Sequence, residues 1–445
     1  MQNTEKKVMT RFAPSPTGFP HLGTAMYAIL NFLYARQNNG IVIMRSEDTD
    51  PVRSKPEYEV AIKEGLAWLG IVPDQFYRQT DRLELYKKYI AKMIADGTAY
   101  ISTEANEEGK VRDLVRFKNP NKVITFRDMS RGDISVDTTD LKDFIIAREV
   151  DSPLYHLTVV VDDFETKVTH IIRGEDGLAN TPRQILIQEA IGAPRPVYAH
   201  YPFVVLPDRS KMGKRNGAIS LQEYKAQGYL PEAIINFIIL MAWHPKDDRE
   251  IFSMDELIKE FNLERIGKSG AILDNKKLDW LNREYLKMIP VDERNTEIAK
   301  WLKSYDISDT KKMEKIYPLI FERISKWSDI DTMIGAGELR YLFDTPQYDT
   351  SLLYWRGNPT PEETKKHLGH VAGLVEKALD NGFSDPEKTK SLVFDYATEV
   401  GRGQVLWPLR VSLSGQEKSP DPFTLMYILG KDEILRRINN AIMRL

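Results

Sequence analysis

The sequence has no cysteine among its 445 residues. Disulfides, thiolate-bound zinc, iron–sulfur clusters and thiol nucleophiles are therefore all excluded. The sequence also lacks an excess of either charge, because 62 basic and 65 acidic residues leave a formal net charge of −3. A polyanionic partner would have to be bound by a local basic patch rather than by the molecule as a whole.

Long apolar runs are missing as well. The most apolar stretch, residues 234–243, is far shorter than the roughly 20 residues that a membrane-spanning helix needs, and Asn236 interrupts it. This stretch is predicted to be a buried helix. Residues 1–10 are polar and have no apolar segment behind them, which predicts no secretory signal. We therefore expect a cytoplasmic protein without a membrane partner.

The remaining composition, 42% hydrophobic and 29% charged, is typical of a globular chain. At about 100–200 residues per domain, its length predicts two to four domains. Residues 7–13 and 41–45 are predicted strands, and residues 21–37 place apolar side chains such as Ala25 and Ile29 at helical spacing. Such a strand, helix and strand predict a βαβ unit, and hence a nucleotide-binding α/β domain at the start of the chain.

The hydrophobic periodicity changes over residues 97–151, which are polar and in which the apolar pattern is interrupted. Apolar runs then predict further elements, namely strands at 157–161, 169–172 and 203–206 and a helix at 181–191. The segment from about 85 to 160 is therefore interpreted as an insertion between two halves of one α/β domain. Beyond Ser220 the periodicity is helical nearly to the C-terminus.

A first cluster of candidate residues is Arg11-Phe-Ala-Pro-Ser-Pro-Thr-Gly18 followed by His21-Leu-Gly-Thr24, where the first predicted strand gives way to its helix. Ligands of open α/β sheets bind beyond the carboxyl ends of the strands, where a helix N-terminus offers N–H groups to a phosphate. Gly18 and Gly23 would let the backbone approach a nucleotide, and His21 can hydrogen-bond a phosphate oxygen. Taken alone, the cluster is better explained as a tight turn with an ordinary histidine than as a nucleotide site.

A second cluster, Ser210-Lys-Met-Gly-Lys-Arg-Asn-Gly217, follows the predicted strand that ends at Leu206. Lys211 and Lys214 can neutralise the charge that builds on a reacting phosphate and a leaving pyrophosphate. A solvated basic loop explains the same residues, so neither cluster decides the matter alone.

The two clusters occur in a fixed order, with one α/β half, an insertion and a second α/β half between them. In this arrangement they resemble the signatures of class I aminoacyl-tRNA synthetases. Residues 14–18 with His21 and Gly23 resemble the HIGH signature, and residues 211–215 resemble the KMSKS loop of the glutamyl-tRNA synthetases. Further blocks agree with that family in its bacterial type over nearly the whole chain: 45–50, 155–163, 172–176, 180–184, 228–233, 277–282 and 403–410.

One other segment, His367-Leu-Gly-His370, is closer to HIGH in its letters. It lies in a charged amphipathic helix pattern, has no strand before it and follows the KMSKS-like loop. We expect these two histidines to be solvent-facing or lightly packed.

The resemblance implies an α/β fold, namely a Rossmann-like class I synthetase catalytic domain with an inserted connective domain, followed by all-α stem-contact and anticodon-binding domains. The implied boundaries are 1–85 for the first catalytic half, 86–160 for the connective, acceptor-binding insertion, 161–224 for the second catalytic half with the KMSKS-like loop, 225–310 for the stem-contact helices and 311–445 for the anticodon-binding helices.

The implied activity is that of a glutamate–tRNA ligase. Such an enzyme activates L-glutamate with ATP and Mg²⁺ to glutamyl-adenylate, and then transfers it to the 3′-terminal ribose of tRNA for glutamate, releasing AMP and diphosphate. Whether tRNA for glutamine is also charged stays open. We expect a monomer acting in protein biosynthesis.

The family's amino-acid pocket corresponds to Arg11, Ala13, Ser15, Glu47, Tyr155 and Arg173. Arginines suit the two carboxylates of glutamate and an acid suits its ammonium, while a buried Arg11 would disfavour neutral glutamine. His21, Lys211 and Lys214 correspond to the catalytic residues. The ATP site would comprise Pro14, Thr17, Gly18, His21, Gly23, Thr24, Lys211, Met212, Lys214 and Arg215.

Some charged residues in the matching blocks have a structural explanation. Arg45 pairing with Asp48, and Asp162 and Asp163 serving as caps or loop hydrogen bonds, are preferred to direct chemistry. For RNA contact, Trp355 with Arg356 and Trp407 with Arg410 are candidates to hold unstacked anticodon bases, with Trp407 favoured as a core residue. Trp280 and Leu281 are expected to face a core.

The sequence departs from the family in two places. Gly213 stands where the KMSKS-like loop usually has serine, which removes a hydroxyl and adds backbone freedom. Residues 99–103 have no counterpart of the cysteine cluster that binds zinc in many relatives, so neither zinc nor another resident metal site is predicted.

Three rival functions remain. A short paralogue that glutamylates a modified nucleoside lacks an anticodon domain, which the length after residue 310 argues against. An RNA-binding pseudoenzyme is suggested by Gly213 but disfavoured by retained residues such as Arg11 and Lys214. A glutaminyl-tRNA synthetase fits the all-helical C-terminal part less well.

Replacing Lys214 tests the sequence interpretation. Lys214→Ala is expected to reduce adenylate formation by orders of magnitude, because a cation near the reacting phosphates is lost, with little change in folding. Pyrophosphate exchange measured with tRNA present, together with circular dichroism, checks both points. Near-normal exchange by this variant would contradict the interpretation.

Overall fold

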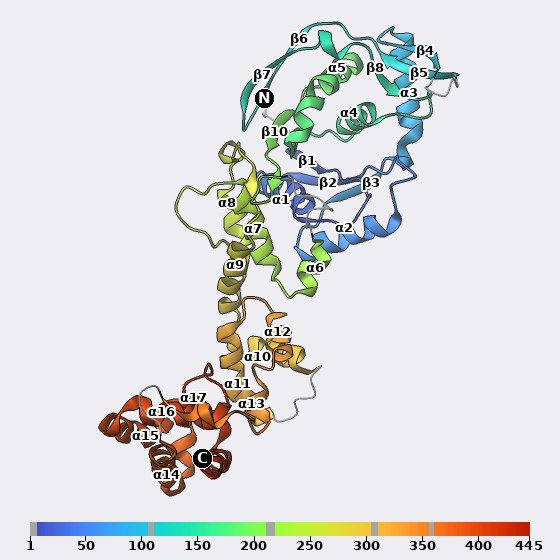
Figure 1. Cartoon of the computed structure of the whole chain (residues 1–445). Coiled ribbons are helices and arrows are strands. Elements are labelled where there is room, and N and C mark those ends of the chain that lie inside the picture. The colour runs from blue at the N-terminus through green and yellow to red at the C-terminus, as the bar shows by residue number, and fades with distance from the viewer. Residues whose placement is uncertain (1–6, 106–110, 211–218, 304–309, 356–359) are drawn as a thin grey trace. The chain divides into compact units, whose positions relative to one another are not determined.

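In the computed structural model, the chain begins with the expected βαβ unit (Figure 1). Strand β1 (Met9–Phe12) leads into α1 (Leu22–Gln37) and then β2 (Ile41–Ser46), which pairs with β1 in parallel. Strand β3 (Gln75–Arg78) continues the parallel sheet on the far side of β2. The structure describes residues 7–105, 111–210, 219–303, 310–355 and 360–445.

A second set of strands adjoins β1 on its other side. Strands β9 (His170–Gly174) and β10 (Val197–Tyr201) are parallel, β6 (Val123–Asp128) is parallel to β10, and β7 (Gly132–Asp137) is antiparallel to β6. The N–H of Thr169, just before β9, donates to the Met9 carbonyl at 2.9 Å. The strand order therefore reverses between β1 and β9, which is where doubly wound sheets bind their ligands.

Helices cover both faces of this sheet, as the alternation along β2 shows. Val42 and Met44 point into a core that includes α1 and α7 (Pro231–Ala242), whereas Ile43 points into a second core on the other face. Three helices supply that second core: α3 (Leu83–Ala95), α4 (Tyr155–Glu165) and α5 (Thr181–Ile191). The α/β class expected from the sequence is confirmed.

The strand predicted at 157–161 is wrong, because these residues lie in α4. Their β-branched run favours a strand, but the helix is buried around most of its circumference, which removes the periodicity that would identify it. Helical geometry matters for the next two residues. Asp162 and Asp163 would point to opposite faces of a strand, but in a helix they lie about 100° apart, and both reach buried arginines.

The inserted segment contains its own small sheet. Strands β4 (Ala99–Ala105), β5 (Val111–Phe117) and β8 (Phe144–Ala147) are antiparallel in that order. The β6–β7 hairpin instead continues the main sheet, since Tyr198 of β10 pairs with Asp128. This part looked polar and broken in the sequence because its strands alternate exposed and buried residues, as in β6.

The remaining elements are mostly helices. The first of two compact units ends at Lys287 and also contains α2 (Pro56–Trp68), β11 (Val204–Val205), α6 (Leu221–Ala226), α8 (Met254–Glu260), β12 (Ala271–Ile272) and α9 (Asn275–Met288), whose last residue opens the second unit. The second unit, Met288–Leu445, contains α10 (Val291–Leu302), α11 (Thr310–Arg323), α12 (Asp329–Gly335), α13 (Arg340–Phe343), α14 (Pro361–Lys377), α15 (Pro386–Val400), α16 (Arg402–Ser414), α17 (Pro422–Leu429) and α18 (Lys431–Arg444).

The helical interpretation after Ser220 is confirmed apart from the short β12, which pairs with β11. Residues 234–243 fall in or next to the buried helix α7, as predicted, and none of the described helices is long and apolar enough to cross a membrane. His367 on α14 is more buried than expected, at 8% exposure, and its Nδ1 is 2.8 Å from the Tyr396 hydroxyl. His370 is exposed and stacks on the same tyrosine.

Replacing Asp163 tests how far the first unit depends on the carboxylate that α4 places between Arg11 and Arg45. Asp163→Asn leaves Arg11 and Arg45 buried with a weakened partner, so we expect it to destabilise the first unit by about 3–5 kcal/mol. Chemical denaturation monitored by tryptophan fluorescence measures the change. The exposed Asp140→Asn serves as the control and should shift stability by less than about 0.5 kcal/mol. Equal stability of the two variants would contradict the role given to the buried carboxylate.

Candidate active site

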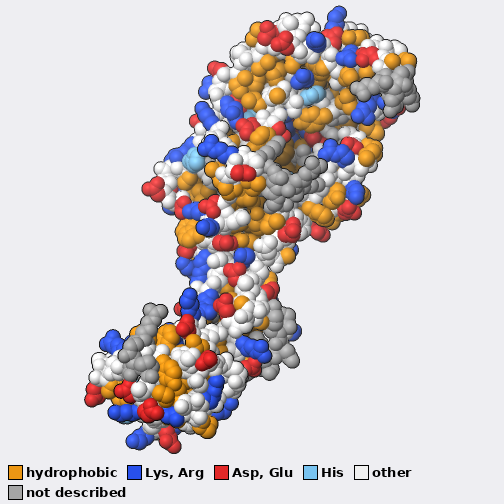
Figure 2. All heavy atoms as spheres, viewed as in Figure 1, with side chains coloured by type: hydrophobic (Ala, Val, Ile, Leu, Met, Phe, Trp, Pro, Cys, Tyr) orange, Lys and Arg blue, Asp and Glu red, His pale blue; other side chains and the backbone are white. Residues whose placement is uncertain are grey.

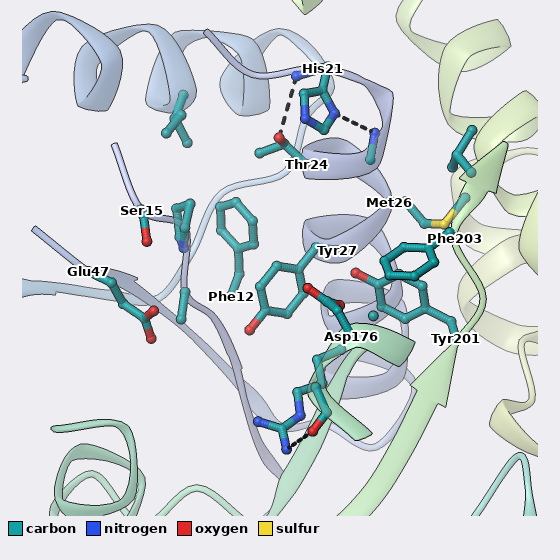
Figure 3. A pocket seen from close by; sticks show the side chains of 18 of the residues that line it. Phe12, Ser15, His21, Thr24, Met26, Tyr27, Glu47, Asp176, Tyr201 and Phe203 are labelled. Atoms are coloured by element: carbon teal, nitrogen blue, oxygen red, sulfur yellow. Dashed lines mark hydrogen bonds between the residues drawn. The ribbon is translucent and has the colours of Figure 1, made fainter. Parts of the chain in front are cut away.

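A pocket of about 470 Å³ opens at the carboxyl ends of β1 and β9, where the strand order reverses. Figure 3 shows Ser15 and Glu47 on one side of it, Tyr201 and Phe203 on the other, and His21 with Thr24 at the start of α1. Every predicted site residue that the structure describes lines this pocket: Arg11, Ala13, Pro14, Ser15, Thr17, Gly18, His21, Gly23, Thr24, Glu47, Tyr155 and Arg173.

The start of α1 forms one end of the pocket. His21 caps the helix, because its Nδ1 accepts a hydrogen bond from the Gly23 N–H at 3.1 Å while Thr24 Oγ1 accepts from the His21 N–H. A neutral His21 therefore carries its proton on Nε2 and can donate it to an anion. A Cβ on Gly23 would lie 2.9 Å from Cε1 of His21, so only glycine leaves the imidazole in place.

The loop before this helix is fixed by backbone hydrogen bonds. The Glu47 N–H donates to the Pro14 carbonyl at 3.0 Å, and the Lys55 N–H donates to the Pro16 carbonyl at 3.0 Å. The proline-rich segment is thus tied to the residues that follow β2. This arrangement leaves the backbone around Gly18 as part of the pocket wall.

The second cluster lies mostly outside the described residues, which include neither Lys211, Met212 and Gly213 nor Lys214 and Arg215. The chain on either side of it is described. Ser220 forms an antiparallel bridge with His21, and the Leu221 N–H donates to the Pro20 carbonyl at 2.8 Å. The chain that follows the second cluster is therefore joined to the start of α1.

Arg11 is 2% exposed and rises from the floor of the pocket. Its Nε lies 3.3 Å from Asp163, and its Nη1 donates to the Tyr27 hydroxyl at 2.8 Å. Burial alone would raise the pKa of Asp163, but Arg11 and Arg45 hold that pKa below its ordinary value. The carboxylate therefore stays charged and pairs with both guanidinium groups, and Arg45 also pairs with Glu47 and Asp162.

Arg173 has a different set of partners. Its Nε donates to Nε2 of His200 at 3.1 Å, and its Nη2 donates to the Gly177 carbonyl and to Thr181 Oγ1. Within the described residues, Arg173 takes part in no ion pair, and its buried Nη1 has no hydrogen-bond partner. The pocket therefore contains an arginine whose charge is not paired with a protein carboxylate.

Glu47 and Tyr155 complete this end of the pocket. Arg45 Nη2 donates to Glu47 at 3.0 Å, so the alternative pairing of Arg45 with Asp48 is wrong, and Asp48 instead accepts from Thr80. Burial raises the pKa of Glu47 above its ordinary value despite that arginine. Desolvation of the Tyr155 hydroxyl, with Glu47 nearby, raises its pKa to about 12, although 43% of the residue is exposed; the hydroxyl is therefore a donor at neutral pH.

Several lining residues escaped the sequence interpretation. Tyr27 lies on α1 within hydrogen-bonding distance of Arg11, and Asp176, Asn180, Tyr201 and Phe203 also line the pocket. Asp176 and Asn180 fall in blocks that the family resemblance had already marked. Tyr27 could have been found from its place on the helix that the first cluster begins.

The expectations for aromatic side chains outside the pocket are confirmed in some cases and wrong in others. Trp280 is 41% exposed with Lys277 Nζ 4.1 Å from its ring centre, so the expectation that it faces a core is wrong, whereas Leu281 is buried. Trp407 packs against Trp355 at 5.3 Å and donates to the Leu352 carbonyl, in keeping with a core role. Arg356 lies outside the described residues.

Charged side chains are mixed over the visible surface, and possible metal ligands are not grouped within the described residues. Figure 2 shows Lys and Arg side chains interspersed with Asp and Glu over the visible face of each unit, in keeping with the balanced composition. Across the described ranges, no three His, Asp or Glu side chains are grouped as a metal ion would require.

Fold and pocket together define a class I aminoacyl-tRNA synthetase. A family model described as tRNA synthetases class I (E and Q), catalytic domain, matches residues 7–113 and 103–280. A model of an anticodon binding domain matches residues 296–442. The catalytic model covers both glutamate and glutamine enzymes, so it does not separate the two.

Relatives that match the full length of the chain distinguish the glutamate enzymes from the glutamine enzymes. The chain is 37% identical to a glutamate–tRNA ligase from Aquifex aeolicus over 99% of both chains, and 37% identical to one from Francisella tularensis over 98% of this chain and 99% of the relative. A crystal structure of a glutamate tRNA ligase from Elizabethkingia meningosepticum, in complex with its amino acid, superposes with a TM-score of 0.88 at 31% identity, covering 99% of this chain and all of that one. The chain belongs to the glutamate–tRNA ligase family.

Variants of His21 test its part in capping α1. Asparagine is a good N-cap residue and alanine is a poor one, so His21→Asn should keep the first turn of α1 stable while His21→Ala weakens it by about 1 kcal/mol. Hydrogen exchange of the amides of residues 23–25 measures the difference. Equal protection in both variants would show that the imidazole does not cap the helix.

Proposed function

We propose that this chain activates L-glutamate with ATP and transfers it to the terminal ribose of tRNA for glutamate, and that both steps take place in the pocket at the ends of β1 and β9. One observation carries the proposal: residues predicted from the family resemblance, which lie on β1, α1, α4 and β9 and in the loops after β1 and β2, line a single pocket. Two arginines and one glutamate there match the charges of an amino acid with two carboxylates.

The amino-acid end of the pocket would bind glutamate through charge. Arg173 offers its unpaired Nη1 to one carboxylate, Arg11 lies close enough to the pocket to serve the other, and Glu47 accepts the ammonium. Ala13, Ser15 and Tyr155 supply the remaining walls. Neutral glutamine is disfavoured because it would leave an arginine buried beside an uncharged amide.

The other end would bind ATP. The α1 N-terminus and Gly18, with Pro14, Thr17, Gly23 and Thr24, offer backbone and hydroxyl groups to the nucleotide, and His21 offers its Nε2–H to a phosphate oxygen. Lys211, Met212, Lys214 and Arg215 are assigned to the same nucleotide from the sequence. Mg²⁺ would enter with ATP, as this cation usually binds in proteins together with substrate phosphates.

No protein nucleophile is needed for this chemistry. The glutamate carboxylate attacks the α-phosphate and pyrophosphate leaves, after which a ribose hydroxyl of tRNA attacks the adenylate carbonyl and AMP leaves. The protein contributes alignment and stabilisation of phosphate charge. The helical second unit, most of which the anticodon-binding model matches, would hold the tRNA, and the enzyme would act as a monomer.

Charging assays test the proposal. Labelled glutamate should become attached to purified tRNA for glutamate in the presence of ATP, and labelled glutamine should not; tRNA for glutamine is assayed in parallel as a second acceptor. Absence of glutamate attachment to either tRNA would favour an RNA-binding protein without catalysis.

A variant at Glu47 tests the pocket within the same assay. Glu47→Gln keeps an oxygen for Arg45 but loses the charge that would face the ammonium, so KM for glutamate should rise about tenfold to a hundredfold. The exposed Glu64→Gln is the matched control and should leave KM unchanged. An unchanged KM in Glu47→Gln would place the ammonium elsewhere.

A further inference from the structure

Arg173 uses only part of its hydrogen-bonding capacity within the protein. A guanidinium group has five N–H donors. One goes from Nε to His200 at 3.1 Å, and the Nη2 donors go to Gly177 at 3.0 Å and Thr181 at 2.9 Å. Nη1 is buried and has no hydrogen-bond partner among the described residues, on a side chain that lines the pocket. The partners of Nε and Nη2 therefore determine where Nη1 points.

The contact with His200 fixes the tautomer of that histidine. Nε of Arg173 can only donate, so Nε2 of His200 must accept and the ring proton must be on Nδ1. Nδ1 lies 2.6 Å from Oδ2 of Asp128, which accepts that proton. His200 and Asp128 are both fully buried, at 0% exposure. Burial lowers the pKa of His200 in spite of the carboxylate, which keeps the ring neutral at neutral pH.

Asp128 is itself held in one orientation. Its Oδ1 accepts four hydrogen bonds, from the Ser130 N–H at 3.0 Å, the Ser130 hydroxyl at 2.7 Å, the Arg131 N–H at 3.0 Å and the His200 N–H at 3.5 Å. This leaves Oδ2 facing His200. Burial alone would raise the pKa of Asp128, but its bonds to His200 and Ser130 hold that pKa below the ordinary value, so the group is a carboxylate.

Gly177 closes the other side of the guanidinium group. A Cβ at this position would lie 2.3 Å from Nε and 2.9 Å from Cζ of Arg173, so a larger residue would displace the side chain. Arg173 is thus confined between the backbone at Gly177 and the imidazole of His200.

We propose that Asp128 and His200 are positioning residues that aim Nη1 of Arg173 at a carboxylate of the amino-acid substrate. Because Asp128 ends β6, the hairpin inserted between the two α/β halves sets the affinity of the glutamate pocket. This inference rests on the proposed function. The competing view is that the three residues only satisfy one another in the core, with no effect on substrate binding.

Asp128→Asn separates these views through the tautomer of His200. The asparagine oxygen is retained by the backbone N–H groups of Ser130 and Arg131, so its NH₂ group faces Nδ1 of His200. Nδ1 must then accept, the proton moves to Nε2, and two donors confront each other at Nε of Arg173. The variant keeps the size of the side chain and disturbs the direction of Arg173.

Steady-state charging kinetics provide the main measurement. We expect KM for glutamate to rise about tenfold or more in Asp128→Asn, as for loss of a hydrogen bond to a charged group, with KM for ATP and for tRNA within about twofold of wild type. ¹⁵N NMR of the histidine rings should show the His200 proton moving from Nδ1 to Nε2. Asp133→Asn, an exposed position on β7 of the same hairpin, is the control and should change neither quantity.

Two outcomes would overturn the inference: a shifted tautomer with an unchanged KM for glutamate, or a loss of kcat with all KM values unaltered. Should Asp128→Asn fail to fold, Gly177→Ala displaces Arg173 from the opposite side and must raise KM for glutamate by a similar factor; an unchanged KM there refutes the proposal. Failure of the wild-type protein to charge tRNA would refute the proposed function instead, and is seen before any variant is made.

Discussion

The pocket depends on one buried carboxylate, Asp163, which lies between Arg11 and Arg45. Each guanidinium group is almost completely removed from water, which would cost several kcal/mol apiece without a partner. Asp163 reaches both from α4, at 3.3 Å and 2.6 Å, and so joins β1 and β2 to a helix more than a hundred residues later. Arg45 in turn holds Glu47 at the wall of the pocket. The charge of the floor is therefore balanced before any substrate arrives.

Arg173 contrasts with this balanced pair. Its partners are a neutral imidazole, a carbonyl and a hydroxyl, so its positive charge remains for a ligand. A pocket with one compensated and one uncompensated arginine can discriminate by charge without paying for two unpaired cations in the core. Arg173, the uncompensated arginine, is in close contact with Gly177 on one side and His200 on the other, which limits how far it can move when the pocket is empty.

The first βαβ unit could be predicted from the sequence because proline, glycine and helical periodicity mark its boundaries within about 40 residues. The residues of its loop could be assigned because the family resemblance is strongest there. The run 157–161 could not be read correctly, since a buried helix rich in valine has no polar face to reveal its period. His200 and Asp128 were missed for another reason: neither lines the pocket, and 72 residues separate the two partners. Contacts of that kind follow from tertiary structure alone.

The β6–β7 hairpin has a consequence for attempts to dissect this protein. It pairs with one edge of β10 at Tyr198 and Asp128, while the other edge of β10 pairs with β9 over Val197–Tyr201. Excising the inserted segment would turn β10 into a bare edge strand, with N–H and C=O groups open to any other extended chain. A minimal catalytic fragment made in that way would be prone to self-association, and its insolubility would say nothing about the chemistry of the pocket.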